Sequence, residues 1–155
     1  MNQQQHALND TWVLWIRPFD SKDWSINSYK KVYEFDTIEK FWALFNNINK
    51  IENMFFIMRK GIQPTYEDKQ NKGGGTISYT SQPAFAKKEF ESLAMALAGE
   101  TLVNEDKIND ITGISFLPKN GVAIMKIWFK HYKQNSRIRL NYQFKSRVKV
   151  NSHRY

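Results

Sequence analysis

The segment VAIMKIWFK (122–130) constrains the fold more strongly than any other part of the chain. One of its two alternating series is wholly apolar and consists of Ala123, Met125, Ile127 and Phe129. The other series includes Lys126 and Trp128. Because the side chains of a strand alternate between the two faces of a sheet, this pattern predicts a strand with one face buried and one face open to a ligand.

Other segments extend this pattern to an α+β fold. RIRLNYQFK (137–145) repeats the alternation, with basic and polar groups opposite an apolar face. A helix is expected after Asp36 or Thr37, either of which can act as its N-cap, and a second helix over residues 88–99 that Gly99 ends. We therefore expect an antiparallel sheet with helices on one face only.

Composition restricts the class of protein. A length of 155 residues predicts one domain, which we place at residues 9–145, between a loose N-terminal arm (1–8) and a basic C-terminal tail (146–155). The net charge of +8 favours polyanions such as nucleic acid as partners. The N-terminus is polar and no apolar run has membrane-spanning length, so we expect a soluble, cytoplasmic monomer that does not contact a membrane.

The sequence contains no recognisable catalytic centre. Cysteine is absent, and the histidines His6, His131 and His153 lack the spacing of metal ligands. The glycine run NKGGGT (71–76) is not followed by the Lys-Ser/Thr pair of a phosphate-binding loop, so a flexible turn is the simpler interpretation. We expect a protein that is not an enzyme and that needs neither a metal nor a cofactor.

Two large aromatic residues stand in polar loops: Trp24 in SKDWSINS (21–28) and Tyr66 in QPTYEDKQNKGGG (63–75). Rings from two loops can hold a flat base between them, and stacking contributes about 1–3 kcal/mol per base. Glu67 follows Tyr66 and could accept the N1–H and N2–H groups of guanine. The alternative is that each ring covers an edge of the core, and spacing alone does not decide between the two.

Five segments in order resemble the cap-binding family of eukaryotic translation initiation factor 4E, and the similarity covers residues 6–144. They are HALNDTWVLWIRPFD, KDWSINSYKKVYEFDTIEKFWALFNNI, GIQPTYEDKQNKGGG, ALAGE and VAIMKIWFK. Members of that family bind the 7-methylguanosine cap of mRNA. The resemblance implies a curved antiparallel β-sheet with about two long helices on its convex face and a ligand pocket on the concave side.

The resemblance also assigns roles to the site residues. Trp24 and Tyr66 would stack on the two faces of the methylated base, whose positive charge adds a cation–π attraction of about 0.5–2 kcal/mol. Glu67 would accept the N1 and N2 protons, and Trp128 would lie against the N7-methyl group. The candidates for binding phosphates and RNA are Lys72, Lys119, Lys126, Arg137, Arg139, Lys145 and Arg147.

The chain departs from the family pattern at several of these positions. Tyr66 stands where a second stacking tryptophan is usual, and it is a smaller platform. Thr76 and Ile77 replace a basic residue and a tryptophan, and Ile124 replaces a lysine. Lys126, two residues further along the same strand face, is a candidate substitute.

A second implied surface would receive an amphipathic helix from the scaffold factor 4G or from a repressor. Its residues here are His6, Ala7, Leu8, Ile38, Trp42 and Met95. Ile38, Trp42 and Phe45 form an apolar stripe beside the core stripe of their helix, and a helix apolar on two sides is either deeply buried or holds a partner. A tryptophan that merely caps the core is the alternative.

The expected function is binding of capped mRNA and recruitment of a scaffold for translation initiation. A cap-binding repressor or cap-protecting protein, a general RNA-binding module without methyl selectivity, and a cap-processing enzyme are the alternatives; missing catalytic groups disfavour the last. The abundance of Asn, Lys and Ile is typical of an A+T-rich genome, and with the short chain it is compatible with a virus-encoded or parasite member.

Overall fold

The computed structural model describes residues 5–48, 52–119, 121–132, 140–141 and 150–154, the last range by its backbone only. It confirms the predicted α+β class: one sheet has the strand order β2-β1-β3-β5-β6-β4-β7, and every neighbouring pair is antiparallel. The strands are β1 (Ala7–Arg17), β2 (Lys30–Thr37), β3 (Met54–Arg59), β4 (Gly75–Ser81), β5 (Ile111–Lys119), β6 (Val122–Phe129) and β7 (Val150–Arg154). The helices are α1 (Ile38–Phe45), α2 (Pro83–Ala98) and two short 3-10 helices, η1 (Ile26–Ser28) and η2 (Glu105–Asp110).

Local sequence explains where the two α-helices begin. The side chain of Thr37 caps α1 by accepting a hydrogen bond from the Lys40 N–H at 3.1 Å, which satisfies one of the free N–H groups of the first turn. Pro83 occupies the first turn of α2, where its missing N–H costs nothing. The helix predicted over 88–99 therefore begins five residues earlier.

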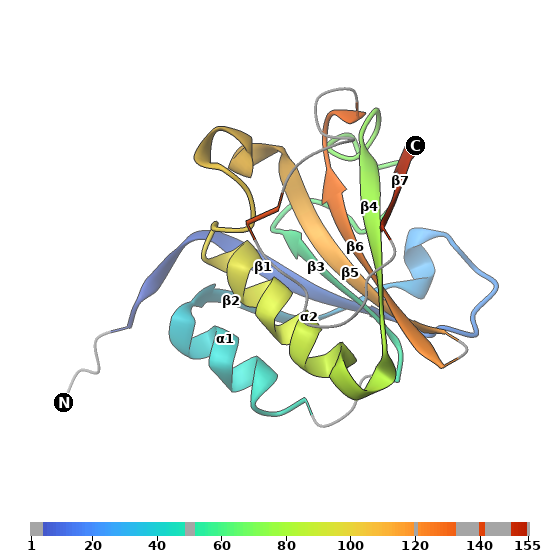
Figure 1. The fold of residues 1–155 in the computed structure, drawn as a ribbon, viewed down its shortest axis with the longest axis horizontal. Helices are drawn as coiled ribbons and strands as arrows, with labels where there is room; N and C mark the ends of the chain where they lie inside the picture. The colour runs from blue at the N-terminus through green and yellow to red at the C-terminus, as the bar shows by residue number, and fades with distance from the viewer. Residues whose placement is uncertain (1–4, 49–51, 120, 133–139, 142–149, 155) are drawn as a thin grey trace.

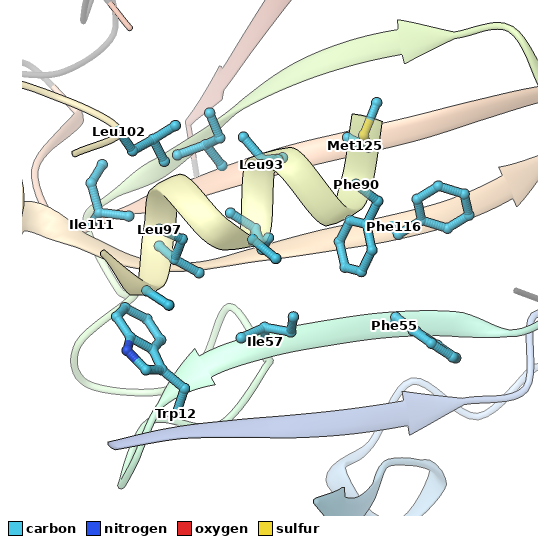
Figure 2. Packing of buried hydrophobic residues seen from close by; sticks show 14 of the residues in the cluster. Trp12, Phe55, Ile57, Phe90, Leu93, Leu97, Leu102, Ile111, Phe116 and Met125 are labelled. Atoms are coloured by element: carbon cyan, nitrogen blue, oxygen red, sulfur yellow. The ribbon is translucent and has the colours of Figure 1, made fainter. Parts of the chain in front are cut away.

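Both helices lie on the same face of the curved sheet, as predicted (Figure 1). On α2 the buried residues Phe90, Leu93 and Leu97 point toward the strands, where they meet apolar side chains such as Ile57 and Met125 (Figure 2). Burial of each such side chain stabilises the fold by about 1.5–3 kcal/mol. This cluster is the main core.

A second, smaller apolar cluster lies on the opposite face of the sheet. Its buried members are Val13, Trp15, Met54, Phe56, Met58, Ile62 and Trp128. The two faces follow from the alternation on β6: Met125 and Ile127 belong to the main core, whereas Trp128 belongs to the second cluster. The second cluster forms the floor on which the candidate site is built.

Strands extend into both segments that were expected to lie outside the domain. β1 begins at Ala7, within the segment expected to be an arm, and β7 lies within the segment 146–155 expected to be a tail. β7 pairs with β4 at the edge of the sheet, with His153 opposite Thr76. In the described part of the chain, no helix has the length and apolar character needed to span a membrane.

Candidate functional site

A cavity of about 140 Å³ lies over the second cluster, on the face of the sheet opposite the two α-helices. Its lining comes from the loop after β1, from β3 and the loop that follows it, and from β5 and β6. The lining residues are Trp24, Tyr29, Met54, Phe56, Pro64, Thr65, Tyr66, Glu67, Ser115, Leu117, Ile124, Lys126 and Trp128. The structure thus brings together all four predicted base contacts, Trp24, Tyr66, Glu67 and Trp128, with Lys126 beside them.

Trp24 is held in its polar loop by Arg17, the last residue of β1. Trp24 is 61% exposed as a residue, yet the Arg17 Cζ lies 3.5 Å from its ring centroid. The Asp23 Oδ1 atom accepts a hydrogen bond from the Ser25 N–H at 2.8 Å, and hydrogen bonding to Ser25 lowers the pKa of Asp23. The ring is therefore exposed and also restrained.

Asn71 organises the loop that carries Tyr66 and Glu67. Its Nδ2 donates to the carbonyl oxygens of Gln63 and Thr65, at 3.0 and 2.9 Å. Its Oδ1 accepts a hydrogen bond of 2.8 Å from the Thr112 hydroxyl, which places the loop against β5. Asn71 is fully buried, so the loop is anchored from within while Tyr66 and Glu67 remain exposed at its surface.

Trp128 forms a fixed wall of the cavity. It is almost fully buried, and its Nε1–H donates to the Ser115 hydroxyl at 3.0 Å. Phe56 meets its ring edge-on with 6.1 Å between centroids. The indole therefore has a packed side and a hydrogen-bonded edge.

Two of the predicted cations line neighbouring cavities. Lys126 lines the first cavity, and its pKa is lowered by burial and by the charge of Lys119. Lys119 is exposed and lines a second, larger cavity of about 1080 Å³, which shares Trp24 with the first. Lys72 is exposed and lines neither cavity. The remaining candidates, Arg137, Arg139, Lys145 and Arg147, lie outside the described residues.

Positions 76 and 124, where the family usually has basic residues, present no basic group to the first cavity. Ile124 lines the first cavity with an apolar side chain. Thr76 is fully buried between β6 and β7, and among the described residues its hydroxyl has no hydrogen-bond partner. A ligand phosphate at the first cavity would therefore meet Lys126 rather than a residue at either of these two positions.

The N-terminal residues of the predicted partner surface lie beside α1. The His6 Nδ1 atom lies 2.6 Å from the Glu39 Oε1 atom, and the Ile38 N–H donates to the His6 carbonyl, so the N-terminal segment lies against α1. Hydrogen bonds from His6 lower the pKa of Glu39 to about 2. Ala7 is exposed and pairs with Thr37 in the β1–β2 register.

The apolar members of that surface differ in exposure. Ile38 on α1 is 44% exposed and Met95 on α2 is 45% exposed. Trp42 and Leu8 are only partly buried and pack against the main core, and the Trp42 ring meets Phe41 edge-on at 5.1 Å. Trp42 therefore covers part of the core and is also partly accessible at the surface, so both interpretations of this residue remain compatible with its position.

Residue-by-residue reasoning on the sequence missed three contributors to the site: Arg17, Tyr29 and Asn71. Arg17 carried a detectable signal, because it shares a strand face with the apolar Val13 and Trp15. Tyr29 lines the cavity, and burial raises its pKa to about 12 against the opposing effect of the Arg17 charge. Asn71 carried no signal, because only the tertiary contact with Thr112 distinguishes it from an ordinary loop asparagine.

The described residues contain no group of three or more acidic or histidine side chains that could bind a metal ion. Asp68, beside Glu67, stabilises the backbone of its loop. Its side chain accepts hydrogen bonds from the backbone N–H groups of Gln63 and Gln70, both at 2.8 Å. The cavity lining offers aromatic rings, hydrogen-bonding groups and charged side chains.

Comparison with known proteins identifies relatives of the chain. The family model described as eukaryotic initiation factor 4E matches residues 7–155. Eukaryotic translation initiation factor 4E-1A of Danio rerio is 30% identical over 144 residues, which is 86% of this chain and 66% of that protein. Eukaryotic translation initiation factor 4E of Homo sapiens is 31% identical over 119 residues, which is 70% of this chain and 54% of the human protein. The chain thus spans slightly less than two thirds of one relative and about half of the other.

Solved structures of eIF4E proteins have a fold similar to that of this chain. The eIF4E-3 of Ascaris suum, solved with an m7G cap, has a TM-score of 0.74 and 25% identity, covering 86% of this chain and 78% of that one. The eIF4E-3 of C. elegans, solved with the 4E-binding protein Mextli and a cap analog, has a TM-score of 0.77 and 24% identity, covering 86% and 79%.

Proposed function

The chain belongs to the eukaryotic initiation factor 4E family, and we propose that it binds the 7-methylguanosine cap of mRNA in the cavity lined by Trp24 and Tyr66. One observation carries this proposal. Separate segments of the chain deliver two exposed rings, a carboxylate, a buried tryptophan and a lysine to a single cavity. The Ascaris suum relative solved with an m7G cap supports the choice of ligand.

In the proposed mechanism, the base lies between the exposed rings of Trp24 and Tyr66. N7 methylation makes the base a cation, which aromatic ring faces attract more strongly than a neutral base. Glu67 accepts the N1–H and N2–H protons as a pair of charge-assisted hydrogen bonds. Lys126 and Lys119 contact the phosphates, and their mutual repulsion falls when phosphate lies near both.

We also propose that the protein recruits a partner through the surface formed by His6, Ala7, Leu8, Ile38, Trp42 and Met95. The exposed Ile38 and Met95 side chains support this, because large apolar groups on a helix surface favour an amphipathic partner. In keeping with a family of cap-binding factors, the chain acts by binding rather than by catalysis. Its place of action is the cytoplasm, where mRNA is translated.

The test is a titration of the protein with 7-methyl-GTP and with GTP, followed by tryptophan fluorescence. Selective quenching by the methylated nucleotide is expected, because the charged base stacks on Trp24 and lies against Trp128. Glu67→Gln should weaken binding of 7-methyl-GTP by about ten- to a hundredfold, since it replaces a charged acceptor by an amide. Glu105→Gln, an exposed position in η2 outside both cavities, is the matched control. Equal affinity for the two nucleotides would contradict cap recognition.

A further inference from the structure

Arg17 is a buried cation that lies directly against the ring of Trp24. Its side chain is fully buried, and its Cζ is 3.5 Å from the Trp24 ring centroid and 5.8 Å from that of Tyr29. On β1 it occupies the strand face that also carries Trp15, opposite Met54 of β3. The Sδ atom of Met54 lies 3.4 Å from the Arg17 Nη1 atom.

The guanidinium also holds the loop in which Trp24 stands. Its Nη1 donates to the Pro18 carbonyl at 3.1 Å, and its Nη2 donates to the carbonyls of Ser21 and Asp23 at 2.8 and 2.9 Å. Across the described ranges of the chain, no carboxylate forms an ion pair with Arg17. A buried cation without such a partner costs free energy, which the carbonyls and the aromatic face offset.

Arg17 supports the ring without blocking the site. Trp24 lines both the 140 Å³ and the 1080 Å³ cavities, whereas Arg17 lines neither of them. The guanidinium therefore covers one part of the indole, and 61% of the residue remains accessible to a ligand. A planar guanidinium suits this place, because it can stack on a ring and donate in its own plane at the same time.

We propose that Arg17 is the positioning residue of the Trp24 platform, and that its charge limits how strongly this platform prefers a cationic base. The first part rests on geometry alone, and the second part rests on the proposed function. A ring that already holds a cation attracts a second cation less, because the two like charges repel each other. The protein thus gains an ordered platform and gives up part of its selectivity for the methylated base.

The first part is tested without any ligand, by 19F NMR of protein labelled with 5-fluorotryptophan. Trp24→Phe identifies the Trp24 resonance. We expect Arg17→Met to shift and narrow this resonance as the ring gains motion, while the resonance of the fully buried Trp12 stays in place as the control for folding. An unmoved Trp24 resonance with an unmoved Trp12 resonance would overturn the positioning role.

Arg17→Lys keeps the test decisive if Arg17→Met also disturbs Trp12. Lysine retains the charge and the aliphatic stem but lacks the planar fork of donors, so the Trp24 resonance should still move. The same resonance in wild-type and Arg17→Lys protein would overturn the proposal. This readout needs no cap, so it separates the role of Arg17 from the proposed function.

The second part is tested by the ratio of the dissociation constants for GTP and 7-methyl-GTP. Arg17→Met should raise this ratio by about three- to tenfold relative to wild type, because the competing charge is removed. Arg17→Lys should keep the low ratio of the wild type, because it retains the charge. An unchanged ratio in Arg17→Met would overturn the effect of charge. A wild-type ratio near one would instead contradict the proposed function.

Discussion

The ring of Tyr66 packs against the ring of Trp128 in a tilted arrangement, with 5.1 Å between the centroids and 31° between the planes. Trp128 is buried and hydrogen-bonded to Ser115, whereas Tyr66 is 44% exposed at the surface of its loop. One partner of this pair is therefore fixed and the other has room to move. Trp128 thus supports the ring of Tyr66, while the exposed part of that ring remains accessible to a ligand.

The size of the ring at position 66 should control affinity. Tyr66→Trp offers a larger and more electron-rich face, so the affinity for 7-methyl-GTP should rise by about three- to tenfold. Tyr66→Leu removes the stacking face and should lower the affinity by about tenfold or more. Isothermal titration calorimetry measures both changes. Phe85→Leu, an exposed aromatic residue of α2 outside both cavities, should leave the affinity unchanged; a similar loss there would point to a general effect on folding.

Asn71→Ala should destabilise the protein and weaken cap binding together. The substitution leaves the Thr112 hydroxyl and the Thr65 carbonyl without their partner, at a cost of about 1–3 kcal/mol for a buried unsatisfied group. Urea unfolding measures this cost, and a nucleotide titration measures the loss of order in the loop. Asn109→Ala, at an exposed position, is the control. If the two variants were equally stable, the anchoring role of Asn71 would be wrong.

Phosphate binding should couple to the protonation of Lys126. Its pKa in the free protein is lowered by burial and by the Lys119 charge, so a rise in pH neutralises Lys126 before an ordinary lysine. A bound polyphosphate favours the charged form and raises this pKa. Affinity for inorganic triphosphate should therefore fall as the pH rises through the lowered pKa, and binding there should take up protons.

Calorimetry in two buffers with different ionisation enthalpies measures the proton uptake. Lys126→Met should bind triphosphate more weakly and should lose the uptake of protons. Lys88→Met, on the helix side of the sheet, should behave like wild type. Identical pH dependence in Lys126→Met and wild type would exclude Lys126 as the coupled group.

Ile38 and Met95, two exposed apolar residues of the helices, should matter for a partner and not for the cap. Ile38→Asp and Met95→Asp should each weaken binding of an amphipathic helical peptide of the scaffold type by about tenfold or more, because they place a charge in an apolar contact. Affinity for 7-methyl-GTP should stay the same. Val32→Asp replaces a similarly exposed apolar residue on β2 and serves as the control. Equal effects of all three substitutions on the peptide would contradict the proposed docking surface.

Elements with strong local patterns were predictable. The apolar series of β6 is buried in the main core as expected, and the other series carries Lys126 and Trp128 to the cavity. The N-cap of α1 is one of the two residues proposed for it, Thr37. β3 was not predicted, because its MFFIMR sequence is apolar without alternation and its two faces pack against different clusters. β7 was hidden by its basic and polar composition.

The sequence by itself determined which side chains could face which side of each strand, because alternation along a strand is a local property of the backbone. It also placed Trp24, Tyr66 and Glu67 in loops, and the resemblance assigned them a ligand. Only the tertiary structure decided that these loops meet Trp128 at one cavity and that Arg17 lies against Trp24. Such contacts join segments far apart in the chain, and their free energy depends on packing and burial that no local pattern contains.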